Sequence, residues 1–147
     1  MKKLVLALAV CAALVAASFA TAAGMPSVHF VAPMAGAKTG STVTFRVKLT
    51  NFKLDAADVG KTKKANMGHL HFQMDGGKYD YPKYSGANGK IAVQLGVQGK
   101  YSPSLNNKVT YTGLPKGKHK VTVFLVRNNH ANYPNKAAKR TITFTVK

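Results

Sequence analysis

The sequence contains one cysteine, Cys11, and no glutamate or tryptophan. Cys11 lies in an apolar stretch near the amino terminus that we expect to be removed during export, which leaves a mature chain without a thiol. Disulfides, thiolate metal ligands and cysteine nucleophiles are therefore excluded from the mature protein. The sequence also lacks a Gly-x-Ser-x-Gly elbow and a phosphate-binding glycine loop. We expect a binding protein and not an enzyme.

Residues 1–22 have the order of a secretory signal peptide. Lys2 and Lys3 precede an uncharged run from Leu4 to Ala17, and small residues with Ala-x-Ala spacing follow as far as Ala23. The apolar run is too short for a membrane span, so we predict cleavage after residue 22 or 23 and no transmembrane segment in the mature chain. These features predict a periplasmic or secreted protein with one domain, residues 25–147.

Acidic residues are scarce. The sequence has 22 Lys and Arg against four Asp, and loss of Lys2 and Lys3 with the signal lowers the net charge from +18 to +16. A charge this one-sided favours anionic partners, namely envelope lipid head groups, acidic polysaccharide, or extracellular nucleic acid without specific base readout. The alternative explanation is that the charge keeps the protein soluble by repulsion between molecules.

Apolar residues in the mature chain recur with a period of two, which is typical of half-buried antiparallel strands. The segment from Thr42 to Leu49 is the clearest, because every second residue from Val43 onward is apolar and the residues between are polar. In Thr141 to Val146 the same alternation points Ile142, Phe144 and Val146 inward. The other predicted strands are Val28 to Ala32, Met67 to Met74, Lys90 to Leu95, Lys108 to Thr112 and His119 to Val126.

About seven strands and no long helical pattern predict an all-β fold, an immunoglobulin-like antiparallel β-sandwich. Asp75-Gly76-Gly77 is suited to a hairpin between two strands, and Leu114 to Gly117 to a corner that leads into a strand. Two polar segments break the pattern, at 52–66 and 128–139. We expect the first of these to be a solvated loop.

Two stretches resemble bacterial envelope proteins. Val28 to Ala37 resembles the opening strand and Pro-x-x-Gly turn of bacterial immunoglobulin-like envelope domains. Leu114 to Val123 is similar to the Leu-Pro-x-Gly-x-Tyr strand of periplasmic copper-resistance proteins of the CopC type. That family has an Asp-Gly-His loop after this strand. Here the loop ends in Asn129-His130, so the histidine matches and an asparagine stands where the acidic ligand would be.

A second resemblance covers nearly the whole mature chain. Gly68-His69-Leu70-His71, Gly117-Lys118-His119 and Asn129-His130 together look like a group of small secreted bacterial domains of uncharacterised function. Those domains carry a Gly-His-x-His strand, a Gly-Lys-His corner and an Asn-His or Asp-His loop. The resemblance implies a sandwich fold and export, and it implies no particular activity.

His69 and His71 are two residues apart on a predicted strand and therefore share a face. The alternation assigns Leu70, Phe72 and Met74 to the core and points both histidines outward with Gln73. Paired imidazoles on a rigid strand can chelate a copper-like ion, nickel or zinc, and His130 is the expected third ligand. Met67 would add a thioether for Cu(I). We also expect the surrounding lysines to lower the imidazole pKa values and keep the rings neutral. The alternative is an exposed strand whose histidines bond to their neighbours.

The remaining histidines have structural interpretations. His119 takes the place of the corner tyrosine of many immunoglobulin-like domains, and its ring N–H is expected to bond to nearby backbone. His29 alternates with Val28 and Phe30 and is expected to be an ordinary strand residue.

An alternative binding surface lies after the Met67–Met74 strand. The segment interleaves tyrosines and lysines, which could stack sugars or bases beneath a polyanion; its residues are Lys78, Tyr79, Tyr81, Lys83 and Tyr84. The other interpretation is an edge strand or loop protected by lysine and proline.

Overall fold

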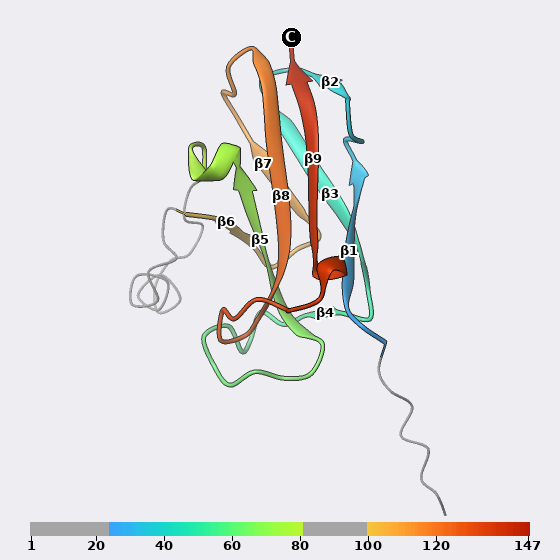
Figure 1. The fold of residues 1–147 in the computed structure, drawn as a ribbon. Helices are drawn as coiled ribbons and strands as arrows, with labels where there is room; N and C mark the ends of the chain where they lie inside the picture. Colours follow the sequence, from blue (N-terminus) through green and yellow to red (C-terminus); the bar gives the residue numbers. More distant parts are fainter. Residues whose placement is uncertain (1–23, 81–99) are drawn as a thin grey trace, which may run out of the picture.

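The computed structural model describes residues 24–80 and 100–147. They form two packed sheets, as Figure 1 shows. The smaller sheet has the order β1-β3-β7, made of Ser27–Ala32, Val43–Thr50 and Lys108–Tyr111. The larger has the order β2-β9-β8-β5-β4, made of Lys38–Thr39, Lys139–Val146, Gly117–Arg127, Met67–Met74 and Lys53–Leu54. In this second sheet the short strand β6, Ser102–Ser104, also pairs with β5.

The predicted all-β sandwich of the immunoglobulin type is confirmed. Each predicted strand within the described residues is present, with bounds shifted by at most a few residues, whereas the predicted strand at 90–95 lies outside them. The pairing is not wholly antiparallel, because β2 pairs with β9 and β4 with β5 in parallel. These two strands have only two residues each and lie at the sheet edges, which the two-residue rhythm of longer strands does not reveal.

The core lies between the sheets and follows the predicted alternation. Along β3 the side chains of Val43, Phe45 and Val47 are buried while the residues between them are exposed. Phe45 meets Phe144 of the opposite sheet at 5.2 Å between ring centroids, in an edge-to-face contact. Such aromatic pairs add about 0.5 to 1.5 kcal/mol beyond the area that they bury. This contact helps to hold the two sheets together.

Gly68 allows β5 and β8 to approach closely. Its φ of +156° is one that residues with a side chain rarely adopt, and a Cβ atom built on it would lie 1.9 Å from the backbone oxygen of Val126. No side chain fits there without moving the backbone of β8. The glycine of the Gly-His-x-His sequence thus sets the pairing in which His69 lies opposite Val126 and His71 opposite Phe124.

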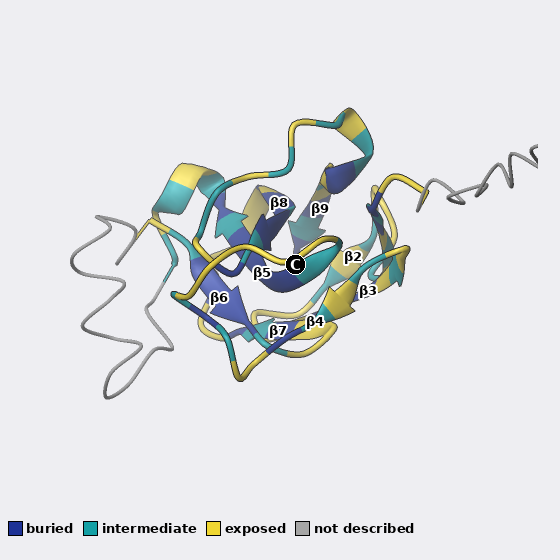
Figure 2. Ribbon diagram, turned by 90° about the horizontal axis from the view of Figure 1, so that it is seen from below, coloured by how far each residue is buried: buried dark blue, intermediate teal, exposed yellow. Residues whose placement is uncertain are grey.

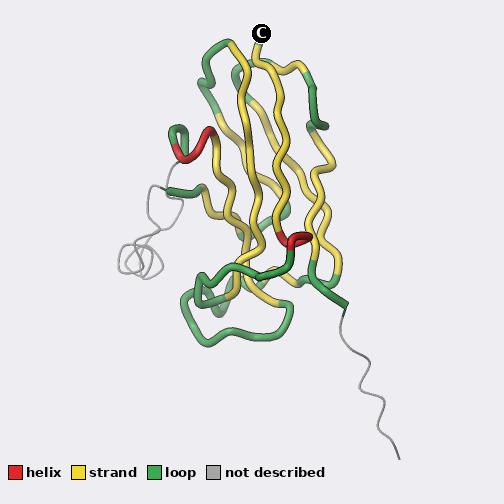
Figure 3. The backbone as a smooth tube through the Cα atoms, in the orientation of Figure 1, coloured by secondary structure: helices red, strands yellow, loops and turns green. Residues whose placement is uncertain are grey.

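Of the two turns predicted from the sequence, one is confirmed and one is wrong. The corner at Leu114 leads into β8 at Gly117, as predicted. Asp75–Gly77 is a short 3₁₀ turn, η1, and not a tight hairpin, because β5 finds its antiparallel partners in β6 and β8, which come much later in the chain. Figure 3 shows this turn at the end of β5.

Two long connections lie at the same end of the sandwich, as Figures 1 and 3 show. One joins β4 to β5, and the other joins β8 to β9 and contains the 3₁₀ turn η2, Lys136–Ala138. The first is not fully solvated as predicted, because Asp55 and Val59 are buried in it. Within the described residues, no helix combines the length and the hydrophobicity that a bilayer span requires. The predicted signal, residues 1–22, lies outside them.

Candidate metal centre

His69 and His71 lie on the outer face of the larger sheet, opposite Leu70 and Phe72, as the alternation predicts. Their predicted exposure is wrong. His69 is 0% exposed and His71 is 2% exposed. In this part of β5 both faces are buried, which Figure 2 shows as dark blue along the strand. The cause is that residues from other parts of the chain pack on the outer face, which the pattern of the strand itself does not indicate.

Two parts of the chain contribute to this cover. The ring of Tyr101, just before β6, stacks on His71 with 5.0 Å between centroids and an interplanar angle of 21°. The ring of His130, in the connection after β8, lies 4.6 Å from His69 and 5.5 Å from His71 between centroids. Tyr101 also meets Phe124 of β8 edge to face. The imidazoles are therefore enclosed between the sheet and these rings.

The turn after β8 brings His130 into place. The backbone N–H of His130 donates to the carbonyl of Arg127 at 2.8 Å, and the N–H of Arg127 donates to Ala131 at 2.8 Å. His130 has a φ of +63°, in the left-handed region, which turns the chain back over the sheet. Because β8 pairs with β5, a turn at its end lies beside His69.

Three imidazoles therefore converge, and His130 lies at the same end of the sandwich as His69, as a third ligand must. Nε2 of His69 and Nε2 of His71 are 3.1 Å apart, a hydrogen bond in which one ring donates. One nitrogen from each of His69, His71 and His130 can be chosen so that all lie within 4.8 Å of one another. For metal–nitrogen distances of about 2.0 to 2.1 Å, a 3.1 Å separation of two nitrogens corresponds to an angle of about 100° at the metal. Two nitrogens on one such ion lie at most about 4.2 Å apart. The His69–His71 pair meets this limit, whereas the 4.8 Å limit for the whole group exceeds it, so the three rings must draw slightly closer to share one ion.

The rings are held in their neutral form. Burial lowers the pKa of His69 to about 2, and the neighbouring His71 and His130 lower it further. Burial and His130 lower the pKa of His71 to about 3, and burial lowers that of His130. The sequence also predicted lowered imidazole pKa values, but the leading cause of the lowering is burial and not the surrounding lysines. Neutral imidazole is the form that binds metal ions.

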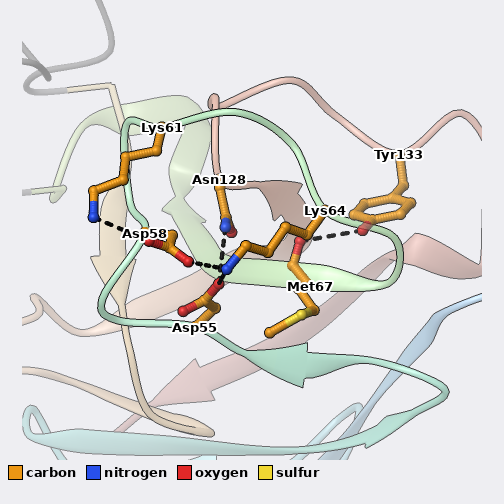
Figure 4. A network of polar contacts seen from close by, with 7 residues as sticks. All are labelled: Asp55, Asp58, Lys61, Lys64, Met67, Asn128 and Tyr133. Atoms are coloured by element: carbon orange, nitrogen blue, oxygen red, sulfur yellow. Dashed lines mark hydrogen bonds and ion pairs between the residues drawn. The ribbon is translucent and has the colours of Figure 1, made fainter.

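A network of polar contacts supports the turn that carries His130, as Figure 4 shows. The side-chain amide of Asn128, which is fully buried, donates to a carboxylate oxygen of Asp55 at 2.9 Å. The backbone oxygen of Asn128 accepts from the N–H of Gly60 at 2.6 Å. Lys64 forms ion pairs with Asp55 and Asp58 in the same loop. The connection before β5 therefore fixes the turn after β8.

The other residues singled out in the sequence lie elsewhere. Met67, the first residue of β5, lines a surface hollow with Gly24 and Asn66, and its backbone oxygen accepts from the hydroxyl of Tyr133 at 3.3 Å. Its role as a ligand stays a prediction. His29 is exposed on β1 opposite Lys48, as expected of an ordinary strand residue.

The structural interpretation of His119 is confirmed. Nε2 of His119 lies 2.8 Å from the backbone oxygen of Pro115, to which it donates, and Nδ1 lies 2.7 Å from a carboxylate oxygen of Asp75. This is the link to nearby backbone that a corner tyrosine would make. Burial lowers the pKa of His119, but the hydrogen bonds to Pro115 and Asp75 outweigh it and raise the pKa overall.

The alternative tyrosine and lysine surface is only partly described. Tyr79 is half-buried against the core and meets His119 edge to face, and the ammonium of Lys78 lies 5.3 Å from the centre of its ring. Tyr79 is therefore partly occupied by contacts within the protein. Tyr81, Lys83 and Tyr84 lie outside the described residues.

Sequence reasoning missed Tyr101, Asn128 and Asp55. A tyrosine before Ser-Pro-Ser gives no sign that it stacks on a histidine of another strand. The Asn128–Asp55 bond joins residues 73 positions apart. The polarity of the 128–139 segment was the one feature of the sequence that indicated an unusual connection between the last two strands.

Comparison with known proteins identifies no family. No protein-family model matches the chain, and no match was found among curated proteins. A solved chain described as "Structures of Clostridium thermocellum CbhA fibronectin(III)-like modules" aligns over 82% of this chain and 96% of its own length, at 13% identity and a TM-score of 0.42. The class, an all-β sandwich of the immunoglobulin type, is defined by the two packed sheets. The resemblances to CopC-type proteins and to the group of secreted domains gain no support from these comparisons.

Proposed function

We propose that this protein is an exported binding module that holds a copper-like metal ion through His69, His71 and His130. The observation that carries the proposal is the convergence of three imidazoles, with ligating nitrogens within 4.8 Å of one another. Three histidines from two separate chain segments form a set that imidazole-binding metals such as copper and zinc accept. Burial of His69 and His71 keeps their rings neutral and restricts their motion before an ion arrives, which reduces the cost of binding.

Calorimetric titration of the mature protein with Cu(I) under reducing, anaerobic conditions, and separately with Cu²⁺ and Zn²⁺, tests this function. We expect binding of one ion per chain that is weakened at least about 100-fold in His69→Ala, His71→Ala and His130→Ala, because each removes one of the ligands. His29→Ala is the matched control, since His29 is exposed on the other sheet. Absence of binding, or equal loss in His29→Ala, would contradict the proposal. Met67→Leu in the same series tests the thioether.

A second function, association with anionic envelope polymers, is favoured by the outer face of the smaller sheet. Arg46 lies directly opposite Lys108 there, and both are exposed. Like charges in directly opposed positions destabilise a sheet, and β1, β3 and β7 contain no acidic residue to relieve them. An anionic partner would relieve this repulsion. The residues proposed from the sequence for this role, Lys78 and Tyr79, lie outside this face.

Salt-dependent retention on heparin separates the two functions. If the outer face of the smaller sheet binds polyanions, Arg46→Ala and Lys108→Ala should elute at lower salt than Lys118→Ala. Lys118 is an exposed lysine on the other sheet. The three histidine variants should elute with the unmodified protein. Equal elution of all lysine and arginine variants would show that only total charge matters, and would remove the support for a specific polyanion surface.

A further inference from the structure

The charge available around the three histidines limits which ions the site can hold. The mature chain has only four side-chain carboxylates and no thiol, so the side chains able to cancel the charge of a metal ion are Asp55, Asp58, Asp75 and Asp80. All four lie within the described residues, and their positions can be compared with that of the histidine cluster.

Each of the four carboxylates is engaged elsewhere. Asp55 accepts from Asn128, and Asp58 pairs with Lys61 and Lys64. Asp75 accepts from His119 and from the backbone of Lys120, and Asp80 accepts from Ser102, Tyr111 and the backbone of Met74. Within the described residues, the group of potential ligands that contains His69 includes only histidines. The sequence of segment 81–99, which lies outside the described residues, contains no His, Cys, Asp or Glu.

An ion at this site would therefore keep its full charge in a buried setting. The Born cost of desolvating an ion grows with the square of its charge, so a dication costs about four times as much as a monocation of equal size. Lys139 lies two strands from His71 in the same row of the larger sheet, because both pair with Phe124, and its ammonium is 5.0 Å from the ring centre of Phe124. The net charge of +16 on the mature chain adds to the repulsion of a cation.

The cover over the three rings points the same way, because three imidazoles bind zinc only with a further water molecule. Zinc in proteins is usually bound by four ligands, or by three and a water molecule in an open catalytic site. Cu(I) has a filled d shell and is stable with two or three nitrogen ligands and no anion. The three neutral imidazoles supply that set, and the stacked ring of Tyr101 covers one side of it.

We propose that the three-histidine site selects a monovalent soft cation, Cu(I), over the divalent ions Zn²⁺ and Cu²⁺. This inference rests on the proposed metal-binding function and adds the oxidation state of the ion. The protein would hold Cu(I) without protein carboxylate or thiolate, and it would leave divalent ions to other ligands.

Competition against chelators of known affinity tests the selectivity. Cu(I) is offered with a reductant under anaerobic conditions, and Zn²⁺ and Cu²⁺ are offered separately in chloride-free buffer. We expect the dissociation constant for Cu(I) to be at least about 100-fold lower than that for either divalent ion, a difference set by desolvation of the extra charge. Divalent binding as tight as that of Cu(I), lost in His69→Ala, would overturn the selectivity while leaving the metal-binding function intact. Absence of binding by all three ions would overturn the function itself.

A charged variant and its uncharged counterpart test whether the lack of a nearby anion causes the selectivity. Tyr101→Glu brings a carboxylate next to His71, whereas Tyr101→Gln has nearly the same shape as Tyr101→Glu without the charge. We expect Zn²⁺ to bind at least about tenfold more tightly to Tyr101→Glu than to Tyr101→Gln, because the added anion offsets the second charge of the ion. The affinity for Cu(I) should differ less between the two. Equal affinities for Zn²⁺ would contradict the charge argument.

Discussion

The side-chain amide of Asn128 donates a hydrogen bond of 2.9 Å to Oδ2 of Asp55, and this bond ties the turn that carries His130 to the loop before β5. Asn128 is fully buried and Asp55 is 9% exposed. A carboxylate so placed needs its donor, because water reaches it poorly. The bond therefore links the stability of the loop to the position of a proposed metal ligand.

Asn128→Ala should lower the free energy of unfolding by about 1 to 3 kcal/mol, since it leaves a buried carboxylate without this donor. It should also weaken metal binding by the folded protein, because His130 loses its fixed position. Urea unfolding and metal titration measure the two effects. The matched control is Asn129→Ala, at an exposed neighbour. If the folded Asn128→Ala variant binds metal as tightly as Asn129→Ala, Asn128 has a structural role only.

Tyr101→Ala should let water and competing chelators reach the histidines. The variant removes the ring stacked on His71, whereas Tyr101→Phe keeps it. We expect a chelator to withdraw bound metal from Tyr101→Ala at least about tenfold faster than from the unmodified protein or Tyr101→Phe. Stopped-flow transfer kinetics measure these rates. Equal rates in all three proteins would show that Tyr101 does not shield the site.

His119 makes the stability depend on pH. Its pKa is raised, through Pro115 and Asp75, against burial and the charge of Lys78. A base whose pKa is higher in the folded state contributes stability that is fully present below the unfolded pKa of about 6.5 and is lost as the pH rises through the folded pKa. The stability difference between the unmodified protein and His119→Gln should thus be larger at pH 5.5 than at pH 8.5.

Urea unfolding of both proteins at the two pH values measures this difference. The three clustered histidines are common to both proteins, so their contribution cancels in the comparison. Tyr79, which meets the His119 ring edge to face, is also unchanged. A difference that is larger at pH 8.5 would show that burial outweighs the two hydrogen bonds.

Gly68→Ala should prevent stable folding, because its Cβ would lie 1.9 Å from the backbone oxygen of Val126. Gly113→Ala is the matched control. Gly113 also has a positive φ, of +68°, but a Cβ atom added there would meet nothing within 4 Å. We expect the free energy of unfolding of the control to fall by only about 1 to 2 kcal/mol, the strain of a non-glycine residue in this conformation. Similar stability losses in the two variants would argue against a close approach of β5 and β8.

The sequence was sufficient for the strands and for the face on which each histidine lies. The alternation along β5 separates Leu70 and Phe72 from His69 and His71, because side chains of a strand point to opposite faces. It could not reveal that both faces are buried, since the cover comes from Tyr101 and His130, which are distant in the chain. The alternation along one strand does not predict which residues from distant parts of the chain pack on it.

X-ray absorption spectroscopy of the copper-loaded mature protein tests the central claim most directly. We predict nitrogen scatterers at about 2.0 Å with the outer-shell pattern of imidazole rings. Replacement of His69, His71 and His130 by alanine together should abolish this pattern, and His29→Ala should preserve it. A first shell of oxygen alone, or an imidazole pattern that survives the triple replacement, would show that copper is held elsewhere and that the three histidines are not its ligands.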